Sequence, residues 1–430
     1  MAVTQHPSAQ ESSAPVHPGP LAGYRILDLA DEKGQLCARL LGELGAEVIK
    51  IEPREGDATR NNGPFFRGEP AAEMSVYWWA MNAGKRSITC ELRLEPGRDL
   101  FRQLIAQSDM LIETSRPGEM AALGLDYTAL REVNPALVMV SITNFGQTGP
   151  YCGWQATDIV GSAMGGHMYL NGDEEHGPLR TTAPQAYAQV NFQAAVGAMT
   201  ALYARGVNDG LGQHVDVSMQ ESMTVAMDNN QPIWDIKRIN PRRPGLRRNN
   251  AGVLGARYLF ETSDGWLTAL SAGGLIGPGA GAIIDWLAES GEARGLDSPQ
   301  WREKLTTLTP LEPAELAHLE ETMSLFCRTR EKEALVAEAQ QRGAGWAPVF
   351  GPRELVESKQ LAAREYWVRV THEDIGESFI YPGAPFKLSA TPWTQGGRAP
   401  HIGEHNEQIY GGLLGLEPAE LRRLKMKMVL

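Results

Sequence analysis

Three motifs that mark common nucleotide or acyl enzymes are absent from this 430-residue sequence. No G-x-G-x-x-G follows the first predicted strand, where the turn reads Ala30-Asp31-Glu32-Lys33-Gly34. The interpretation of the chain as an enzyme that binds a nicotinamide dinucleotide therefore loses its main support. No G-x-x-x-x-G-K-[ST] loop occurs, which argues against an ordinary nucleoside triphosphatase. No G-x-S-x-G elbow occurs either, which argues against an α/β-hydrolase.

Positive charge, cysteine and long apolar runs are also scarce. The net charge of −12 argues against the basic face of a nucleic-acid-binding protein. The cysteines lack a C-x-x-C pair and metal-ligand spacing, so we expect free thiols in a reducing cytoplasm and no metal.

No stretch approaches the ~18 apolar residues of a membrane span. The first 19 residues lack the basic start and apolar run of a secretory signal, and residues 1–20 are expected to form a disordered tail. The four cysteines are Cys37, Cys90, Cys152 and Cys327.

The spacing of apolar residues predicts a parallel β-α-β sheet in the first half of the chain. Strands are expected at 24–29, 46–52, 109–113 and 137–142, with helices at 34–45, 96–107 and 127–133. Ligands of such sheets bind at the carboxyl ends of the strands. The informative segments are therefore 30–34, 53–60, 114–118 and 143–149.

The second half begins with a long helix of small residues at 186–205 and a strand at 214–218. The basic, proline-bearing stretch 236–250 predicts a domain boundary. A hairpin around Ser263-Asp264-Gly265 and charged helices within 311–342 are expected in a smaller second domain. Residues 403–430 return to helix.

Motifs in a fixed order resemble the class III CoA-transferase family of the CaiB/BaiF type. They lie at 26–53, 82–92, 109–120, 123–151, 157–166 and 210–222, and the segments 346–358 and 401–409 extend them. The resemblance implies an α/β fold with a large Rossmann-like domain built from both chain ends, 21–235 and 376–430. It also implies a linker and smaller α+β domain at 236–375, and two chains interlocked like links of a chain. The implied substrates are an acyl-CoA and a carboxylic acid, with no tightly bound cofactor.

The family's chemistry depends on one aspartate, which attacks the thioester and forms a mixed anhydride. Counting back from the G-x-x-x-A-L segment at Gly197–Leu202 places this aspartate at Tyr187. A phenol with its ordinary pKa of ~10 is a poor nucleophile at neutral pH and forms no anhydride. No Asp or Glu occurs between His176 and Asn208, so a slip of register does not restore the carboxylate. We therefore expect no catalytic residue at this position.

Asp158, in the sequence Thr157-Asp158-Ile159-Val160, is the remaining candidate acid. In related acyl-CoA racemases an aspartate here works beside a histidine, which is Thr157 in this chain, so racemase activity is not expected. The structural interpretation of Asp158 is a helix N-cap or first-turn acid.

The resemblance also assigns a CoA site to segments that follow the early strands. Lys33, Arg93 and Arg116 are suited to pair with phosphates, although Lys33 and Arg93 are also explained as solvated surface charges. Ala122 and Thr143 occupy positions that often carry basic residues in the family. The full set is Glu32, Lys33, Cys90, Glu91, Leu92, Arg93, Thr114, Ser115, Arg116, Thr143, Asn144 and Phe145.

Four arginines lie within seven residues of the predicted boundary stretch: Arg242, Arg243, Arg247 and Arg248. They are suited to clamp a dicarboxylate, or they form a solvated linker face. The adjoining segment 249–255 matches a glycine loop that covers the family's active site, but only Gly252 and Gly255 are glycines. The candidate substrate residues are Arg247, Arg248, Asn249 and Asn250.

Two functions follow from this combination. The first is a non-catalytic subunit of a heteromeric CoA-transferase whose paralogous partner carries the nucleophile. The turn at 30–34 and the segment 272–282 are similar to those of the two-subunit benzylsuccinate CoA-transferases of anaerobic toluene breakdown, which makes succinyl-CoA and benzylsuccinate the expected substrates. The second is a stand-alone enzyme or acyl-CoA-binding protein with altered chemistry, in which Asp158 takes part.

Overall fold

The computed structural model describes residues 19–227, 230–250, 253–269, 279–307 and 309–430. Most of the expected N-terminal tail, Gly252, and much of the 272–282 segment lie outside these residues. The chain divides into two compact units. Unit 1 contains the chain up to His167 together with Thr181–Ala226 and Lys359–Leu430, and unit 2 contains Met168–Arg180 and Met227–Ser358.

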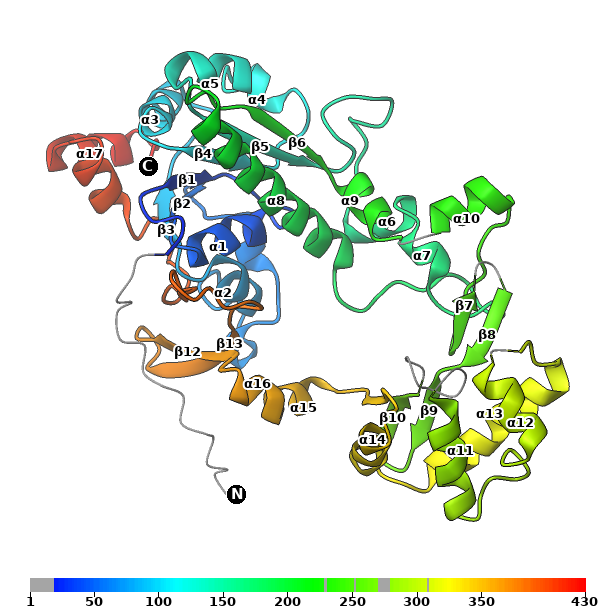
Figure 1. The fold of residues 1–430 in the computed structure, drawn as a ribbon. Coiled ribbons are helices and arrows are strands. Elements are labelled where there is room, and N and C mark those ends of the chain that lie inside the picture. Colours follow the sequence, from blue (N-terminus) through cyan, green and yellow to red (C-terminus); the bar gives the residue numbers. More distant parts are fainter. Residues whose placement is uncertain (1–18, 228–229, 251–252, 270–278, 308) are drawn as a thin grey trace. The chain divides into compact units, whose positions relative to one another are not determined.

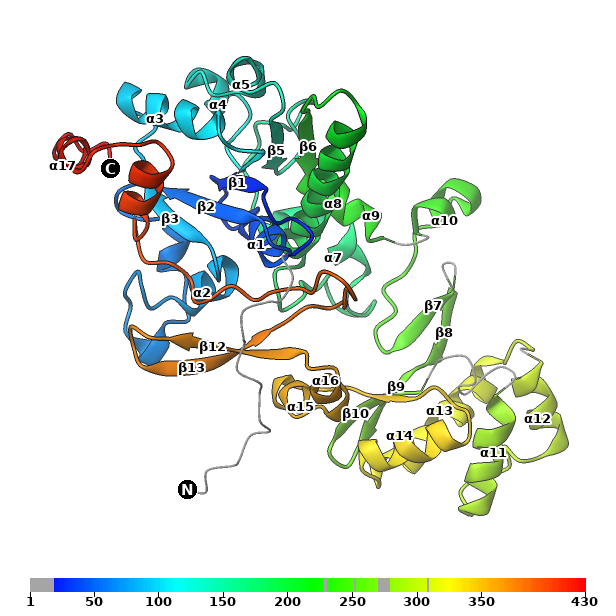
Figure 2. The ribbon, with the colours of Figure 1, turned by 60° about the vertical axis from the view of Figure 1, so that its left-hand side comes forward.

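Unit 1 is built on a six-stranded, fully parallel sheet with the order β3-β2-β1-β4-β5-β6 (Figures 1 and 2). The predicted α/β fold class is therefore confirmed. Strands predicted at 24–29, 46–52, 109–113, 137–142 and 214–218 correspond to β1, β2, β4, β5 and β6. The strands are β1 Arg25–Asp28, β2 Glu47–Glu52, β3 Arg86–Thr89, β4 Met110–Glu113, β5 Val138–Thr143 and β6 His214–Ser218.

Apolar cores cover both faces of this sheet. One core joins it to α1 (Gln35–Glu43), α8 (Gln185–Val207) and α9 (Met219–Val225). The other joins it to α3 (Glu95–Ile105), α5 (Tyr127–Val133) and the C-terminal α17 (Pro418–Met426). Residues of both chain ends thus build one domain. Shorter helices of unit 1 are α2 Val76–Asn82, α4 Glu119–Ala122, α6 Asp158–Met164 and α16 Lys359–Ala363, and α7 His167–Leu170 begins at its edge.

Small residues let α8 lie close to the sheet. Its buried positions include Ala186, Ala194, Ala198 and Ala201. A β-carbon on Gly197 would lie 2.9 Å from Val215 Cγ1, closer than such contacts allow. The small-residue pattern at 186–205 therefore reflects close packing within this chain.

A hairpin of β12 (Trp367–His372) and β13 (Glu377–Pro382) was not expected from the sequence. Its Val370 and Tyr381 share a small core with Trp78 and Trp79 of α2. This packing explains why residues 359–375 group with unit 1, although the sequence analysis assigned them to the second domain. Residues 168–180 likewise group with unit 2.

Unit 2 combines short antiparallel strands with helices. The expected hairpin at Ser263–Gly265 is present, with β9 (Leu259–Thr262) paired to β10 (Gly265–Thr268). The stretch 236–250, where a domain boundary was predicted, contains the end of α10 (Asn230–Lys237) and β7 (Arg247–Asn250), which pairs with β8 (Val253–Arg257). The remaining elements are α11 Ala280–Glu289, α12 Pro299–Thr306, α13 Pro313–Arg328, α14 Lys332–Gln341, β11 Ala347–Pro348 and α15 Pro352–Val356. None of the helices in the described ranges is both long and apolar enough to cross a membrane.

Candidate functional site

The turn that follows β1 is held in place by hydrogen bonds to buried side chains. The carboxylate of Asp28 accepts the Ala30 N–H at 2.8 Å, and the Lys50 ammonium donates to the Ala30 carbonyl. The Asp31 N–H donates to Thr114 Oγ1 at 2.9 Å, which ties this turn to the segment after β4. Glu32 and Lys33 are therefore presented from a fixed backbone at the carboxyl end of the sheet.

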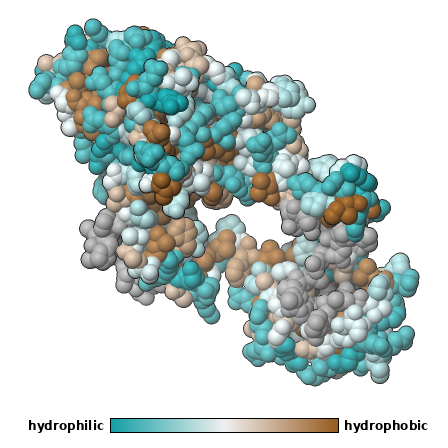
Figure 3. Space-filling view, turned by 45° about the horizontal axis from the view of Figure 1, so that its top comes forward, coloured by the Kyte–Doolittle hydropathy of each residue, from teal (hydrophilic) through white to brown (hydrophobic). Residues whose placement is uncertain are grey.

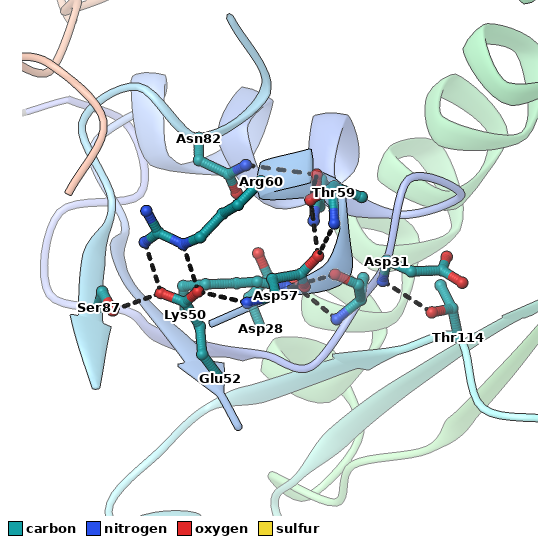
Figure 4. Close-up of polar contacts among 12 residues, drawn as sticks. Asp28, Asp31, Lys50, Glu52, Asp57, Thr59, Arg60, Asn82, Ser87 and Thr114 are labelled. Carbon is teal, nitrogen blue, oxygen red and sulfur yellow. Dashed lines mark hydrogen bonds and ion pairs between the residues drawn. The ribbon is translucent and has the colours of Figure 1, made fainter. Parts of the chain in front are cut away.

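A buried network of charges lies beneath this turn (Figure 4). Lys85 Nζ donates to Asp28 Oδ2 at 2.8 Å, and Lys50 Nζ lies 2.9 Å from Asp57 Oδ2. Burial lowers the pKa of Lys85 to about 8, although Asp28 opposes the shift. Burial raises the pKa of Asp57, but the stronger combined effect of Lys50 and hydrogen bonds from Thr59 lowers it to about 2. Buried charges are retained only when they are paired, and these pairs fix the base of the site.

A second pair joins the same network from β2. Arg60 donates to both oxygens of Glu52, at 2.7 and 2.8 Å, and Ser87 Oγ donates to Glu52 Oε1 at 2.5 Å. Arg60 also donates to the Pro400 carbonyl at 3.0 Å and lies over the Trp78 ring. This arginine thus connects the sheet to a distant segment of the chain.

A cavity of about 330 Å³ opens at the carboxyl ends of β1, β4 and β5. It collects six of the twelve residues that the sequence assigned to a CoA site: Lys33, Thr114, Ser115, Arg116, Thr143 and Asn144. Further lining residues are Leu29, Asp31, Pro117, Glu119 and the run 152–156. The run 152–156 was not predicted, because the segment expected after β5 ended at Gly149, although aromatic residues continue beyond it.

Two polar atoms of residues that line this cavity have no hydrogen-bond partner among the described residues. They are Thr143 Oγ1 and Asn144 Oδ1, both buried. Buried polar atoms in folded proteins are nearly always hydrogen-bonded, so an unpaired pair beside a cavity is suited to bind polar groups of a ligand. Amide groups of the kind found along the CoA arm offer both donors and acceptors.

The other predicted CoA residues lie outside the lining of this cavity. The Cys90 thiol donates to the Gly97 carbonyl at 3.3 Å, and burial raises the pKa of Cys90 to about 12. The Arg93 side chain is 79% exposed and donates to Glu91 at 2.7 and 2.5 Å. Leu92 packs against the core of α3 and α17, and Phe145 contacts the rings of Tyr151 and Trp154.

Lys33 is not a freely solvated charge. Its side chain is 15% exposed and forms an ion pair with Asp31. Arg116, by contrast, has a side chain that is 66% exposed, with Nη2 donating to Gln155 Oε1 at 3.1 Å. Arg116 is therefore the cation of this cavity that is best placed to meet an anionic ligand group.

Tyr187 lies in the first turn of α8 and points its hydroxyl at the β1 turn. The hydroxyl donates to Glu32 Oε1 at 2.9 Å, while Glu32 Oε2 accepts from Asn62 Nδ2 at 3.3 Å. Burial and the charge of Glu32 raise the pKa of Tyr187 above its ordinary value. Tyr187 is thus a protonated hydrogen-bond donor at neutral pH, and both oxygens of Glu32 are engaged.

Asp158 begins α6 and accepts hydrogen bonds from the start of α8. Its Oδ1 accepts the N–H groups of Ala186 and Tyr187, at 2.8 and 3.2 Å. The unpaired N–H groups at a helix N-terminus favour a carboxylate, so this arrangement is a helix cap supplied from a neighbouring helix. Asp158 Oδ2 is buried and has no partner among the described residues.

Replacing Asp158 with Ala should lower the free energy of unfolding by about 2 kcal/mol, because two N–H groups of α8 lose their acceptor. Asn keeps an acceptor oxygen, so Asp158→Asn should cost less than half as much. Urea denaturation of the two variants measures the difference. Equal losses would show that Asp158 does not act through the cap.

The predicted substrate arginines belong to unit 2 and are engaged within it. Arg247 forms a bidentate ion pair with Glu320, with one contact at 2.7 Å. Arg243 donates to the carbonyls of Asp173 and His176, and Arg242 lies 3.3 Å from Glu174. The backbones of Arg248, Asn249 and Asn250 form part of β7, and their side chains lie outside the description.

The chain is similar to known proteins over most of its length. The chain is 32% identical to the succinyl-CoA:(R)-benzylsuccinate CoA-transferase subunit BbsE of Thauera aromatica over 395 residues, covering 90% of this chain and 92% of that protein. It is 30% identical to the succinyl-CoA–L-malate CoA-transferase beta subunit of Chloroflexus aurantiacus, with 96% and 98% covered. The crystal structure of a CaiB/BaiF family protein from Brucella suis is similar with a TM-score of 0.77 and 27% identity, over 92% of this chain and all of that one.

The family model described as CoA-transferase family III matches residues 21–406, which include the β1 turn, the cavity and the start of α8. Members of this family use CoA thioesters as substrates. The chain therefore belongs to CoA-transferase family III.

Proposed function

We propose that this chain is the non-catalytic subunit of a heteromeric class III CoA-transferase. The complex would move CoA between an acyl-CoA such as succinyl-CoA and a carboxylic acid, with benzylsuccinate as the proposed acid. The observation that carries the proposal is Tyr187, which stands where the family's nucleophilic aspartate is expected and donates its hydroxyl to Glu32.

The two carboxylates beside Tyr187 are poor substitutes for the missing nucleophile. Glu32 has both oxygens in hydrogen bonds, to Tyr187 and Asn62. Asp158 accepts two backbone N–H groups of α8 with one oxygen, Oδ1. Donated hydrogen bonds stabilise the charge of a carboxylate and so make it less nucleophilic, and in Glu32 they engage both oxygens.

The relatives support a paralogous partner. BbsE and the Chloroflexus beta protein are both named as subunits of CoA-transferases, and the Chloroflexus alpha subunit is itself 28% identical to this chain. A partner from the same family would supply the nucleophile. This chain would stabilise the complex in an interlocked assembly and contribute to the site for the acceptor acid.

One face of α8 is suited to contact that partner. Five apolar side chains recur at helical spacing and remain exposed by 36–73%: Phe192, Val196, Met199, Tyr203 and Val207. Such a continuous stripe is unusual on the surface of a monomer. The face drawn in Figure 3 also shows apolar patches among hydrophilic residues.

Charged substitutions in this stripe should dissociate the complex without unfolding the chain. We expect the double variant Val196→Glu/Tyr203→Glu to weaken partner binding by at least tenfold, because two charges would lose water in an apolar interface. Val133→Glu on α5, across the sheet, is the matched control and should bind normally. Light scattering measures the mass of the complex and so reports partner binding, and circular dichroism checks that each variant is folded. Normal binding by the stripe variant would remove α8 from the interface.

Tagging the chain in its native host tests the assembly directly. The proposal predicts that a second family member, with aspartate at the position of Tyr187, co-purifies in a stable complex. A monomer near 47.0 kDa would contradict it, and a stable homodimer would count against an obligate heteromer.

One observation favours a second candidate, a stand-alone enzyme that uses Asp158. The unpartnered Oδ2 of Asp158 is buried close to the start of α8. If this oxygen takes part in chemistry, the chain alone should turn over an acyl-CoA, and Asp158→Asn should abolish that activity while leaving the fold intact.

A further inference from the structure

Three aromatic residues, Phe145, Tyr151 and Trp154, form an aromatic platform at the border of the cavity. The proposed function assigns no role to it. Trp154 lines the cavity and is 52% exposed, and its ring centroid lies 4.1 Å from that of Tyr151. Phe145 contacts both rings edge-on, at 6.3 and 6.4 Å between centroids. Asn144 Nδ2 donates to the Trp154 carbonyl at 3.2 Å. These contacts hold the indole in place while half of the residue stays open to solvent.

A cation lies next to this platform. Arg116, whose side chain is 66% exposed, donates to Gln155, the residue that follows Trp154. Its charged neighbour is Glu119, which accepts the Arg116 backbone N–H at 2.9 Å and lies 3.9 Å from Nε, so the guanidinium forms an ion pair with Glu119 but no hydrogen bond. The cavity therefore combines an open indole, an accessible guanidinium, and the unpaired Thr143 Oγ1 and Asn144 Oδ1.

We propose that Trp154 stacks against a planar aromatic ring of the ligand that enters this cavity, while Arg116 faces an anionic group of the same ligand. The inference rests on the proposed function, because it takes a CoA thioester and a carboxylic acid as the ligands. Aromatic rings stack on indole with little dependence on their identity, and guanidinium pairs well with phosphate or carboxylate.

Two ligands of the proposed reaction carry a ring beside an anion. One is the nucleotide end of CoA, with its adenine and phosphates, and the other is an aryl carboxylic acid such as benzylsuccinate. The shared chemistry is ring stacking beside an anion. Stacking of the nucleotide would place the adenine in this cavity, whereas Cys90–Arg93, which the sequence also assigned to the CoA site, lie outside its lining.

Calorimetric titration of the full chain distinguishes the two sources. The probes are CoA, pantetheine, which lacks the nucleotide, and benzylsuccinate. We expect Trp154→Ala to lower the affinity for one of the two ring-bearing probes, CoA or benzylsuccinate, by about tenfold or more. The affinity for pantetheine should stay unchanged. Trp154→Phe should stay within about threefold of the natural chain, because phenylalanine still stacks. Trp234→Ala on α10, another exposed tryptophan, is the control and should change nothing.

Each outcome has a defined meaning. A loss for CoA alone assigns the platform to adenine, and a loss for benzylsuccinate alone assigns it to the acid. Unchanged affinity of Trp154→Ala for both ring-bearing probes overturns this inference and leaves the proposed function standing. Failure of the natural chain to bind any probe overturns the inference and the ligand-binding part of the proposed function together.

Fluorescence provides a readout that does not depend on the alanine variant folding. Binding of the ring-bearing probe should quench tryptophan emission of the natural chain, and Trp154→Phe should lose that quenching while still binding. Quenching that survives in Trp154→Phe would place the ring elsewhere.

Discussion

Purified alone, the chain is expected to transfer CoA from succinyl-CoA to a carboxylic acid no faster than the buffer does. Tyr187 offers a protonated hydroxyl where a carboxylate is required, and burial together with Glu32 raises its pKa further. Chromatography of the CoA thioesters, with succinyl-CoA and several acids including benzylsuccinate, measures the rate. Tyr187→Phe should be equally inactive, and turnover by the homogeneous natural chain would refute the assignment.

A carboxylate restored at position 187 should be opposed by Glu32 at acidic pH. Like charges raise the pKa of a carboxyl group, so the new side chain of Tyr187→Asp should ionise at a higher pH when Glu32 is ionised. Replacing Glu32 with Gln removes this charge. If the pKa differs by one unit, the double variant Tyr187→Asp/Glu32→Gln should exceed Tyr187→Asp by about tenfold at a pH below that pKa, and match it at neutral pH, where both carboxyl groups are ionised. Equal activity of the two variants at acidic pH would show that Glu32 does not oppose the carboxylate.

The second large effect concerns the buried pair beneath the site. Glu52→Gln should lower the free energy of unfolding by about 2–3 kcal/mol, because the buried guanidinium of Arg60 loses its bidentate carboxylate while it keeps the ion pair with Glu73, at 2.7 Å. Glu377→Gln breaks the exposed pair with Arg67, whose side chains are 67% and 42% exposed, and should cost less than about 1 kcal/mol.

Denaturant unfolding of the two variants compares them directly. Equal losses would mean that the buried network contributes no more than a surface ion pair. A larger loss for Glu52→Gln would show that the buried network stabilises the chain more than a surface ion pair does.

The sheet was predictable because its strands carry continuous apolar runs between amphipathic helices. Met110–Glu113 and Val138–Thr143 are buried along their length, so their sequences read as central strands. The β12–β13 hairpin alternates between exposed and less exposed residues, and its packing partners Trp78 and Trp79 lie almost 300 positions earlier in the chain. A pattern within a short stretch of sequence therefore does not predict the packing of this hairpin against α2.

The site was predictable only in part, for a similar reason. Residues directly after strands, such as Thr114 and Thr143, lie at the cavity because the ends of parallel strands meet at one edge. The bond between Tyr187 and Glu32 joins positions 155 residues apart, and the platform at Trp154 depends on how a loop folds back. Spacing along the sequence gives neither arrangement.

Mapping the covalent intermediate tests the central claim most directly. The complex isolated with this chain is incubated with succinyl-CoA and quenched with hydroxylamine, which converts an acylated or thioesterified carboxylate into a hydroxamate that peptide mass spectrometry locates. We predict a hydroxamate on an aspartate of the partner chain and none on this one. A hydroxamate at Glu32 or Asp158 of this chain would contradict its assignment as the non-catalytic subunit.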